Sequence, residues 1–399
     1  MNLRNWVSKL RPRRHMRVIV FIGHHKTGST ALQAHLARHA PAALRAGILY
    51  PSVTQEDQTA FDWIFDAGDA EQPLSRNVSE AHNALAFSMI HDHNPAAPVP
   101  PFHSNLPATS EMFSLIRRQI ARYRPHTLVL ASEVFANFPA ISPALIADLV
   151  DGLGLSRSGA EIELFASLRR IDDYLASWHA QRLRMGQKVP PLPKALPVYQ
   201  RGVHFDYRLM LEGWQQVLPQ ARLTLAPYDR ALRAQGMPRA FAEAMRLDLP
   251  GLEGAPRRAN AGLHRGLLEI ARQGARALEP GEAHKLFLTL MDLTPELDLP
   301  VSQDVELWGA EARAQMLADF APIHDWLSGQ YGQVFFPDLD EIGNSRPLRE
   351  AQVTAQALAQ IRRAHMGAFL PAGQHFLAGL GAADAPGRGD KDEPVMRAG

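Results

Sequence analysis

Short, largely apolar runs alternate along the first half of the chain with stretches that carry apolar residues at helical spacing. Such runs, each ending at a polar residue, proline or glycine, occupy residues 17–22, 127–131, 161–168 and 222–226, and residues 47–51 form a shorter one. Runs of this length that are apolar on both faces are typical of buried strands. Because helical stretches separate them, the pattern predicts an α/β fold whose parallel sheet is flanked by helices on both faces.

The helical stretches show apolar residues three or four positions apart, as in Leu32, Leu36, Ala40 and Leu44. We expect helices in the first part of the chain over residues 29–44, 111–123, 143–153 and 205–217. Beyond residue 238 the pattern is helical almost throughout, with expected helices over 238–246, 263–277, 282–291, 311–331 and 348–369. Residues 52–108 show weak periodicity, which is typical of loops and short helices.

These patterns predict a chain of four parts. Residues 1–16 form a basic arm, and residues 17–260 form an α/β core with an insertion at about 52–108. Residues 261–380 form a helical part packed on that core. Residues 381–399 are too small and polar to fold.

The composition restricts the possible functions. Lys and Arg (42) nearly balance Asp and Glu (41), so no overall field favours nucleic acid, and an anion site must be a local cluster. The absence of cysteine excludes disulfides, thiol nucleophiles and thiolate metal sites, and it favours a reducing compartment, for which we expect the cytoplasm. Residues 1–17 carry six cations with Trp6 and Leu10, so they could contact an anionic membrane surface weakly or form a solvated arm.

A phosphate-binding loop is predicted at residues 23–30, which read Gly-His-His-Lys-Thr-Gly-Ser-Thr. The loop joins a buried strand to a helix, so its backbone N–H groups and the positive end of the helix dipole would converge on an anion. Gly23, Gly28 and Thr30 fit the spacing of the nucleoside-triphosphatase loop G-x-x-x-x-G-K-[ST]. The lysine of that motif is missing, however, because position 29 is serine and the lysine of this loop is Lys26.

The run Lys26-Thr-Gly-Ser-Thr30 resembles the 5'-phosphosulfate loop of sulfotransferases that use 3'-phosphoadenosine-5'-phosphosulfate (PAPS). This resemblance is closer to bacterial sulfotransferase-like proteins than to the animal cytosolic enzymes. It implies a P-loop-type fold and transfer of a sulfuryl group from PAPS to an acceptor hydroxyl, such as that of a carbohydrate or another alcohol, without a metal. The residues implied to bind the 5'-phosphate are Lys26, Thr27, Gly28, Ser29 and Thr30.

The same resemblance implies a second anion site for the 3'-phosphate. In the family, an arginine at a strand end and a serine eight residues later hold this group, and Arg169 and Ser177 have that spacing, with Arg170 as the adjacent alternative. An arginine fork can bind phosphate with two hydrogen bonds. Tyr228 resembles the aromatic residue near the adenine. The pair Arg257 and Arg258 falls where a basic loop returns to the 3'-phosphate, although alanine replaces the glycine that usually follows.

Two groups of residues could carry the proton transfer. Glu133 follows the apolar run 127–131, where related enzymes carry a catalytic His or Glu, so it is the first choice for the base, with Lys26 as the cation beside the leaving phosphate. The alternatives are the loop histidines His24 and His25 or the insertion histidines His82, His91, His93 and His103. Glu133 would also suit magnesium coordination in a kinase or nucleoside triphosphatase, which is the rival function, and a silent nucleotide-binding protein is the third.

Overall fold

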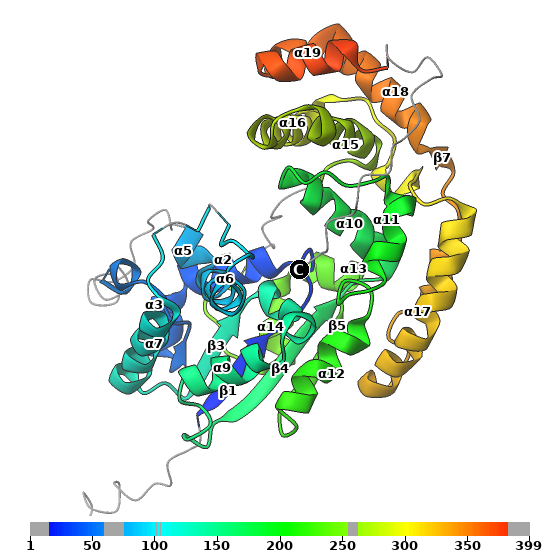
Figure 1. The fold of residues 1–399 in the computed structure, drawn as a ribbon. Helices are drawn as coiled ribbons and strands as arrows, with labels where there is room; N and C mark the ends of the chain where they lie inside the picture. The colour runs from blue at the N-terminus through cyan, green and yellow to red at the C-terminus, as the bar shows by residue number, and fades with distance from the viewer. Residues whose placement is uncertain (1–15, 60–75, 101, 104, 254–261, 382–399) are drawn as a thin grey trace, which may run out of the picture. The chain divides into compact units, whose positions relative to one another are not determined.

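The computed structural model describes residues 16–59, 76–100, 102–103, 105–253 and 262–381 (Figure 1). The chain divides into two compact units, which are considered separately below. The sheet unit comprises residues 1–168 and 208–257, and the helical unit comprises residues 169–207 and 258–399. Residues 169–207 therefore group with the C-terminal part of the chain, and no sequence pattern indicated this exchange.

A parallel five-stranded sheet forms the centre of the sheet unit, in the order β2-β3-β1-β4-β5 (Figure 1). The strands are β1 (Arg17–Phe21), β2 (Ile48–Leu49), β3 (Thr127–Ala131), β4 (Glu161–Leu168) and β5 (Arg222–Pro227). In the middle of the sheet Val20 of β1 pairs with Leu130 of β3 and Leu164 of β4. The predicted α/β fold with a parallel sheet is thus confirmed.

Both faces of the sheet are buried. Alternate residues of a strand point to opposite faces, so the residues of β1 report on both. Ile19 and Phe21 belong to one hydrophobic cluster with Leu32, Leu36 and Phe241, which come from the helices on that side. Val18 and Val20 are also at most 3% exposed. The helices of this unit are α2 (Ser29–Arg38), α3 (Ala40–Arg45), α5 (Arg76–Ser79), α6 (Ala81–His93), α7 (Thr109–Tyr123), α8 (Phe138–Ile141), α9 (Ala144–Gly152), α12 (Tyr207–Val217), α13 (Arg230–Gln235) and α14 (Met237–Ala244).

Two predictions for this unit differ from the structure. The helix expected over 29–44 is two helices, because Pro41 lacks the N–H group that would continue α2, and α3 starts with this proline in its first turn. The insertion contains α6, a helix of 13 residues that is buried around most of its circumference. A helix that is apolar or small on all sides shows no periodic stripe, so its sequence pattern did not reveal it.

The helical unit contains the second set of helices and a small parallel pair of strands, β6 (Val305–Glu306) and β7 (Leu348–Arg349). Its helices are α10 (Ile171–Arg184), α11 (Leu192–Tyr199), α15 (Leu268–Ala277), α16 (Pro280–Leu293), α17 (Ala310–Tyr331), α18 (Glu350–Gln360) and α19 (Pro371–Gly379). The single helix expected over 348–369 ends as α18 at Gln360, and a π turn and a 3-10 turn follow it. In the described part of the chain no helix is both long and apolar enough to cross a membrane.

A buried arginine organises the start of α17. Arg313 is fully buried, and its Nε donates to both carboxylate oxygens of Glu306 at 2.9 and 2.8 Å. Its Nη1 donates to the Ile342 carbonyl at 3.0 Å and lies 3.7 Å from Asp172. Glu306 also accepts from the backbone N–H groups of Trp308 and Gly309. Arg313 therefore pairs with Glu306 and adds positive charge beside Asp172, two carboxylates that belong to separate segments of the unit.

We predict that Arg313→Met lowers the free energy of unfolding of the helical unit by about 3–5 kcal/mol, because it leaves Glu306 and Asp172 with less compensating charge in a buried place. Urea unfolding followed by tryptophan fluorescence measures this loss. Arg349→Met, at an exposed arginine, is the matched control and should change stability by less than about 0.5 kcal/mol. Equal stability of the two variants would contradict the prediction.

The sheet unit should lose stability in mild acid, because it buries a neutral histidine. His82 is fully buried, its Nδ1 accepts from the Ala131 N–H at 3.0 Å, and burial lowers its pKa from 6.5 to about 3. The folded chain thus keeps His82 neutral while the unfolded chain protonates it below pH 6.5. Stability is therefore complete above that pH and falls by about 1.4 kcal/mol per pH unit below it.

His82→Asn should reduce this pH dependence, since asparagine keeps an acceptor for the Ala131 N–H but does not titrate. Denaturation midpoints measured between pH 7 and 4 test it. Part of the dependence should remain in the variant, because burial also lowers the pKa of His35 and of His103 to about 4. A slope that is the same in the variant and the wild type would contradict the assignment to His82.

Candidate functional site

The predicted phosphate loop lies at the carboxyl end of β1, where it is held against β4. The Ile22 N–H donates to the Phe165 carbonyl at 2.9 Å, and the His24 N–H donates to the Ser167 carbonyl at 3.3 Å. A Cβ atom on Gly23 would lie 2.8 Å from the Ser167 nitrogen, a backbone atom that cannot move aside. Glycine at position 23 is therefore required for the chain to run this close to β4.

The loop then turns through two residues in the left-handed region. Lys26 has φ 62° and Gly28 has φ 88°. The Thr27 hydroxyl, which is buried, donates to the His24 carbonyl at 2.7 Å and closes the turn. A non-glycine residue in this region costs about 1–2 kcal/mol, so the surrounding loop must hold Lys26 in place. Backbone strain of this kind clusters at functional sites.

The turn delivers the chain to the first residues of α2. Gly28 is the N-cap of this helix, and the Leu32 N–H donates to its carbonyl at 3.1 Å. No side chain among the described residues caps the first turn at this position. The N–H groups of that turn and the positive end of the helix dipole are thus directed to the inside of the loop, an arrangement that binds anions.

Tyr228, the residue predicted near the adenine, lies beside the loop. A Cβ atom on Gly28 would lie 3.6 Å from the Tyr228 ring and 2.8 Å from the Cβ of Met237, the first residue of α14. The Tyr228 N–H donates to the Leu168 carbonyl at 2.7 Å, which fixes the tyrosine at the end of β5. The structure therefore brings an aromatic ring to the predicted 5'-phosphate loop, while its role at an adenine stays a prediction.

Glu133 also reaches the loop, from the other side of β1. It follows β3 as the first residue of a 3-10 helix (Glu133–Asn137), whose N-cap is Ser132. The His25 Nδ1 lies 3.7 Å from its Oε1, Gln33 Nε2 donates to its Oε2 at 3.1 Å, and Asn83 Nδ2 donates to its Oε1 at 3.4 Å. The side chain of Glu133 is 12% exposed. It is thus surrounded by the loop, α2 and α6.

The environment of Glu133 keeps it ionised. Burial by itself raises the pKa of a carboxylic acid, but hydrogen bonds from His25, from its own backbone N–H and from Ser29 outweigh burial and lower the pKa of Glu133 below its usual value. A carboxylate with a low pKa accepts a proton poorly at neutral pH. Glu133 therefore takes up a proton less readily than an ordinary carboxylate, and its role as the general base stays a prediction.

Two residues of this cluster were missed at the sequence level. Gln33 is fully buried and also donates to the Ala131 carbonyl and to Asn83 Oδ1, both at 3.0 Å. The Ser132 hydroxyl donates to the same Asn83 oxygen at 2.6 Å. Gln33 follows an apolar stripe residue directly, and Asn83 lies in a segment without periodicity, so neither position carried a signal.

The predicted histidine alternatives are separated by the structure. His25 is the one that contacts Glu133 at 3.7 Å, and it is partly exposed. His24 and His82 are fully buried, and burial holds His82 neutral. His103 is also buried, and its Nδ1 lies 3.1 Å from Asn77 Oδ1. His91 and His93 lie at the end of α6, where the His91 Nδ1 is 3.0 Å from the Ala97 carbonyl.

Arg169 and Ser177, two of the residues predicted for the 3'-phosphate, belong to the helical unit. Arg169 lies 3.3 Å from Asp173, which is also 2.6 Å from Arg265. The two arginines lower the pKa of Asp173 despite its burial, and the triad carries a net positive charge. Within the described residues the buried Arg169 Nε has no hydrogen-bond acceptor. Ser177 lies on α10, about two turns into the helix, and is partly buried.

Arg170, the neighbouring alternative, is already paired. Its guanidinium donates to both oxygens of Asp172, at 2.8 and 3.2 Å, and to Asp338. Of the two arginines, Arg169 therefore has the greater capacity to bind a further anion. Arg265 was not found from the sequence. The predicted basic pair, Arg257 and Arg258, lies outside the described residues.

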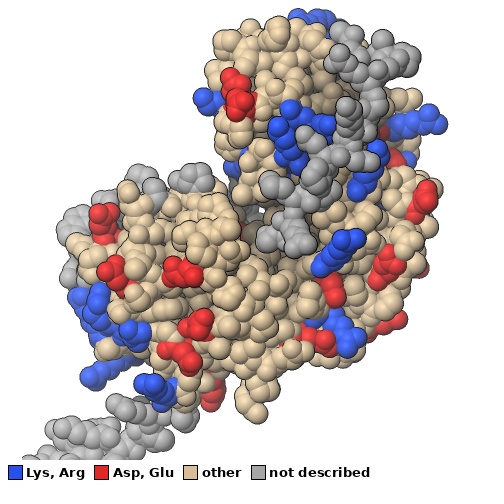
Figure 2. Space-filling model, in the orientation of Figure 1, with Lys and Arg blue, Asp and Glu red and all other residues tan. Residues whose placement is uncertain are grey.

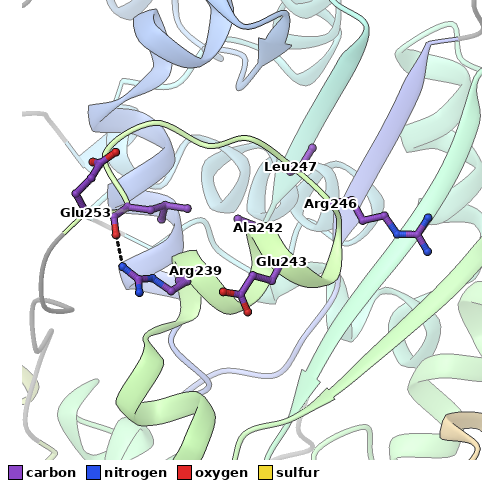
Figure 3. Close-up of a pocket in the computed structure, with 7 residues that line it drawn as sticks. Arg239, Ala242, Glu243, Arg246, Leu247 and Glu253 are labelled. Carbon is purple, nitrogen blue, oxygen red and sulfur yellow. Dashed lines mark hydrogen bonds between the residues drawn. The ribbon is translucent and has the colours of Figure 1, made fainter.

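Other parts of the molecule offer less organised sites. A shallow hollow of about 450 Å³ lies over α14 and includes no residue of the loop (Figure 3). Two arginines and two glutamates balance each other there, and Arg239 donates to the Leu252 carbonyl while Arg246 extends away from the others (Figure 3). In the described ranges no three His, Asp or Glu side chains are arranged to hold a metal ion. On the face shown in Figure 2, acidic and basic side chains are scattered among uncharged ones.

Comparison with known proteins adds no assignment. The chain matches no protein-family model, no curated protein and no solved structure. The candidate site is therefore defined by its geometry alone, as a glycine-containing loop at a strand end with a lysine inside it and a buried carboxylate beside it.

Gly28→Ala should damage this loop, because alanine is strained at φ 88° and its Cβ would lie 2.8 Å from the Cβ of Met237. We expect a loss of about 1–3 kcal/mol in the free energy of unfolding of the sheet unit, and loss of anion binding at the loop. Thermal unfolding with and without adenosine 3',5'-bisphosphate measures both. Gly329→Ala is the control: φ is not positive there and no described atom lies within 4 Å of the added Cβ. It should leave both properties intact or raise stability slightly.

Proposed function

We propose that this protein is a PAPS-dependent sulfotransferase with a P-loop-type fold, which transfers a sulfuryl group to an acceptor hydroxyl of a carbohydrate or another alcohol. The observation that carries the proposal is the position of Lys26. It lies inside the turn, in a left-handed conformation, and not at the first position of α2, where a nucleoside triphosphatase has its lysine. Ser29 occupies that position.

In this proposal the loop binds the 5'-phosphosulfate. The N–H groups of Thr27 to Thr30 and the hydroxyls of Ser29 and Thr30 would hold the phosphate oxygens. Lys26 would neutralise the charge that develops on the phosphate when the sulfuryl group leaves. Tyr228 beside Gly28 would stack near the adenine. Arg169, assisted by Ser177, would bind the 3'-phosphate, for which its unpaired buried Nε supports the assignment.

The rival function, a kinase or nucleoside triphosphatase, has less support. Magnesium in such a site is held by carboxylate and hydroxyl oxygens that are directed to the ion. Here both carboxylate oxygens of Glu133 already accept hydrogen bonds, from Gln33 and Asn83. The terminal phosphate charges would also lack the lysine that normally follows the second glycine.

Adenosine 3',5'-bisphosphate, the product of transfer, should stabilise the protein without magnesium. At a ligand concentration about 100 times the Kd the expected gain is about 2.7 kcal/mol, which raises the melting temperature by several degrees. Lys26→Ala and Arg169→Ala should each weaken binding about 10- to 100-fold, because each removes a charge-assisted contact with a phosphate. Melting curves over a ligand titration measure this.

Lys188→Ala, at an exposed lysine, is the matched control and should bind the bisphosphate like the wild type. ATP with magnesium is the competing ligand. Stabilisation by ATP and magnesium, with none by the bisphosphate, would reject the sulfotransferase in favour of the rival function. Incubation with ³⁵S-labelled PAPS and a panel of saccharides and simple alcohols then identifies the acceptor.

A further inference from the structure

His25 and Glu133 form a pair in which a partly exposed histidine of the loop meets a buried carboxylate. The two atoms, His25 Nδ1 and Glu133 Oε1, are 3.7 Å apart. The side chain of His25 is 16% exposed and that of Glu133 is 12% exposed. A histidine in contact with a carboxylate is oriented by it, and the imidazolium is stabilised once the ring takes up a proton.

We propose that His25 receives the proton of the acceptor hydroxyl and that Glu133 is a positioning residue which acts through His25. The inference rests on the proposed function and deepens it. It reverses the order of the two candidates at the sequence level, where Glu133 was the first choice for the base. His25 is placed for this role because it precedes Lys26, the residue expected beside the leaving phosphate.

Glu133 is held too firmly to exchange protons with a substrate. Its two oxygens accept from Gln33 and Asn83, and these two side chains are themselves fixed. Gln33 also donates to the Ala131 carbonyl at 3.0 Å, and Asn83 accepts from the Ser132 hydroxyl at 2.6 Å. His25, the backbone N–H of Glu133 and Ser29 lower the pKa of Glu133 in spite of its burial. Such a carboxylate stays negative and fixed, which is what a partner of a titrating imidazole requires.

The other titratable groups around the pair leave this arrangement intact. Lys26 follows His25 in the loop. Glu80, before α6, lies 3.2 Å from Asn83 Nδ2 and pairs with Arg76 at 3.6 Å. His103 lies 4.0 Å from Glu80, and burial lowers its pKa to about 4, while burial raises the pKa of Tyr50 above its usual range. At neutral pH His103 and Tyr50 are therefore uncharged.

The transfer step balances with the groups named. The acceptor oxygen forms a bond to sulfur, and the bond between sulfur and the 5'-phosphate oxygen breaks. The electron pair of the broken bond stays on the phosphate oxygen, whose negative charge Lys26 neutralises. The acceptor proton passes to the Nε2 of His25, and Glu133 stabilises the resulting imidazolium through Nδ1. The products are a sulfate ester, adenosine 3',5'-bisphosphate and a proton that His25 later releases to water.

The first test measures the titration of His25 directly, by NMR of histidine-labelled protein in the presence of adenosine 3',5'-bisphosphate. His25→Asn assigns the signal. In Glu133→Gln the carboxylate is gone but the hydrogen-bonding shape remains, so the His25 signal should change at a lower pH than in the wild type. A titration of His25 that is the same in Glu133→Gln and the wild type would overturn the proposal.

The second test compares rates of sulfate release from ³⁵S-labelled PAPS, with water or the acceptor found in the panel, between pH 5 and 9. His25→Asn should lower kcat about 10²- to 10⁴-fold and leave bisphosphate affinity within about threefold. Glu133→Gln should lower kcat less and move the acidic limb of the pH profile downwards with the pKa of His25. His375→Asn, at an exposed histidine of α19, should match the wild type.

The opposite ranking, with full activity in His25→Asn and none in Glu133→Gln, would make Glu133 the base and overturn the inference alone. Absence of bisphosphate binding by the wild type would instead reject the proposed function, and the inference with it. Gln33→Ala adds a further check, since it frees one side of Glu133 without changing any charge. It should broaden or shift the His25 titration, and an unchanged titration would count against the positioning network.

Discussion

The candidate site depends on the central position of β1 in a parallel sheet. Because β3 and β4 pair with β1 on either side and run in the same direction, their carboxyl ends meet at the end of β1. The loop that follows β1 therefore touches β4 through Gly23 and Ser167, and meets Glu133 at the end of β3. If β3 or β4 ran antiparallel to β1, its carboxyl end would lie at the other end of the strands, away from the loop. The parallel register thus determines which side chains can act together.

Within that frame, a buried polar network sets the charge of the site. Glu133 would be expensive to bury alone, and the donors that surround it make its ionised form the stable one. Gln33 and Asn83 join Glu133 to the Ala131 carbonyl and the Ser132 hydroxyl, so the network favours one arrangement of these groups. The network therefore holds the negative charge of Glu133 beside the loop. Because its pKa is lowered, Glu133 takes up a proton less readily.

The parallel sheet was predictable, because apolar runs of strand length separated by helices imply it, and Gly23 and Gly28 mark the loop that follows the first strand. The order of the strands within the sheet was not predicted. Tyr228 was proposed from its resemblance to a family residue at a strand end, and its role stays a prediction. The contacts of Gln33 and Asn83 were not predictable, since hydrogen bonds between residues 50 apart leave no local pattern. The grouping of residues 169–207 with the C-terminal helices was hidden for the same reason.

Asn83 shows that part of the insertion is buried, because it lies on the buried side of α6. At the sequence level this segment was expected to form loops and short helices. Instead α6 carries a buried amide that holds Glu133, and His82 beside it accepts a hydrogen bond from the end of β3. Exchanging the insertion to alter specificity would thus also remove part of the support of the loop. An engineer would have to graft the recognition surface and leave the buried side of α6 unchanged.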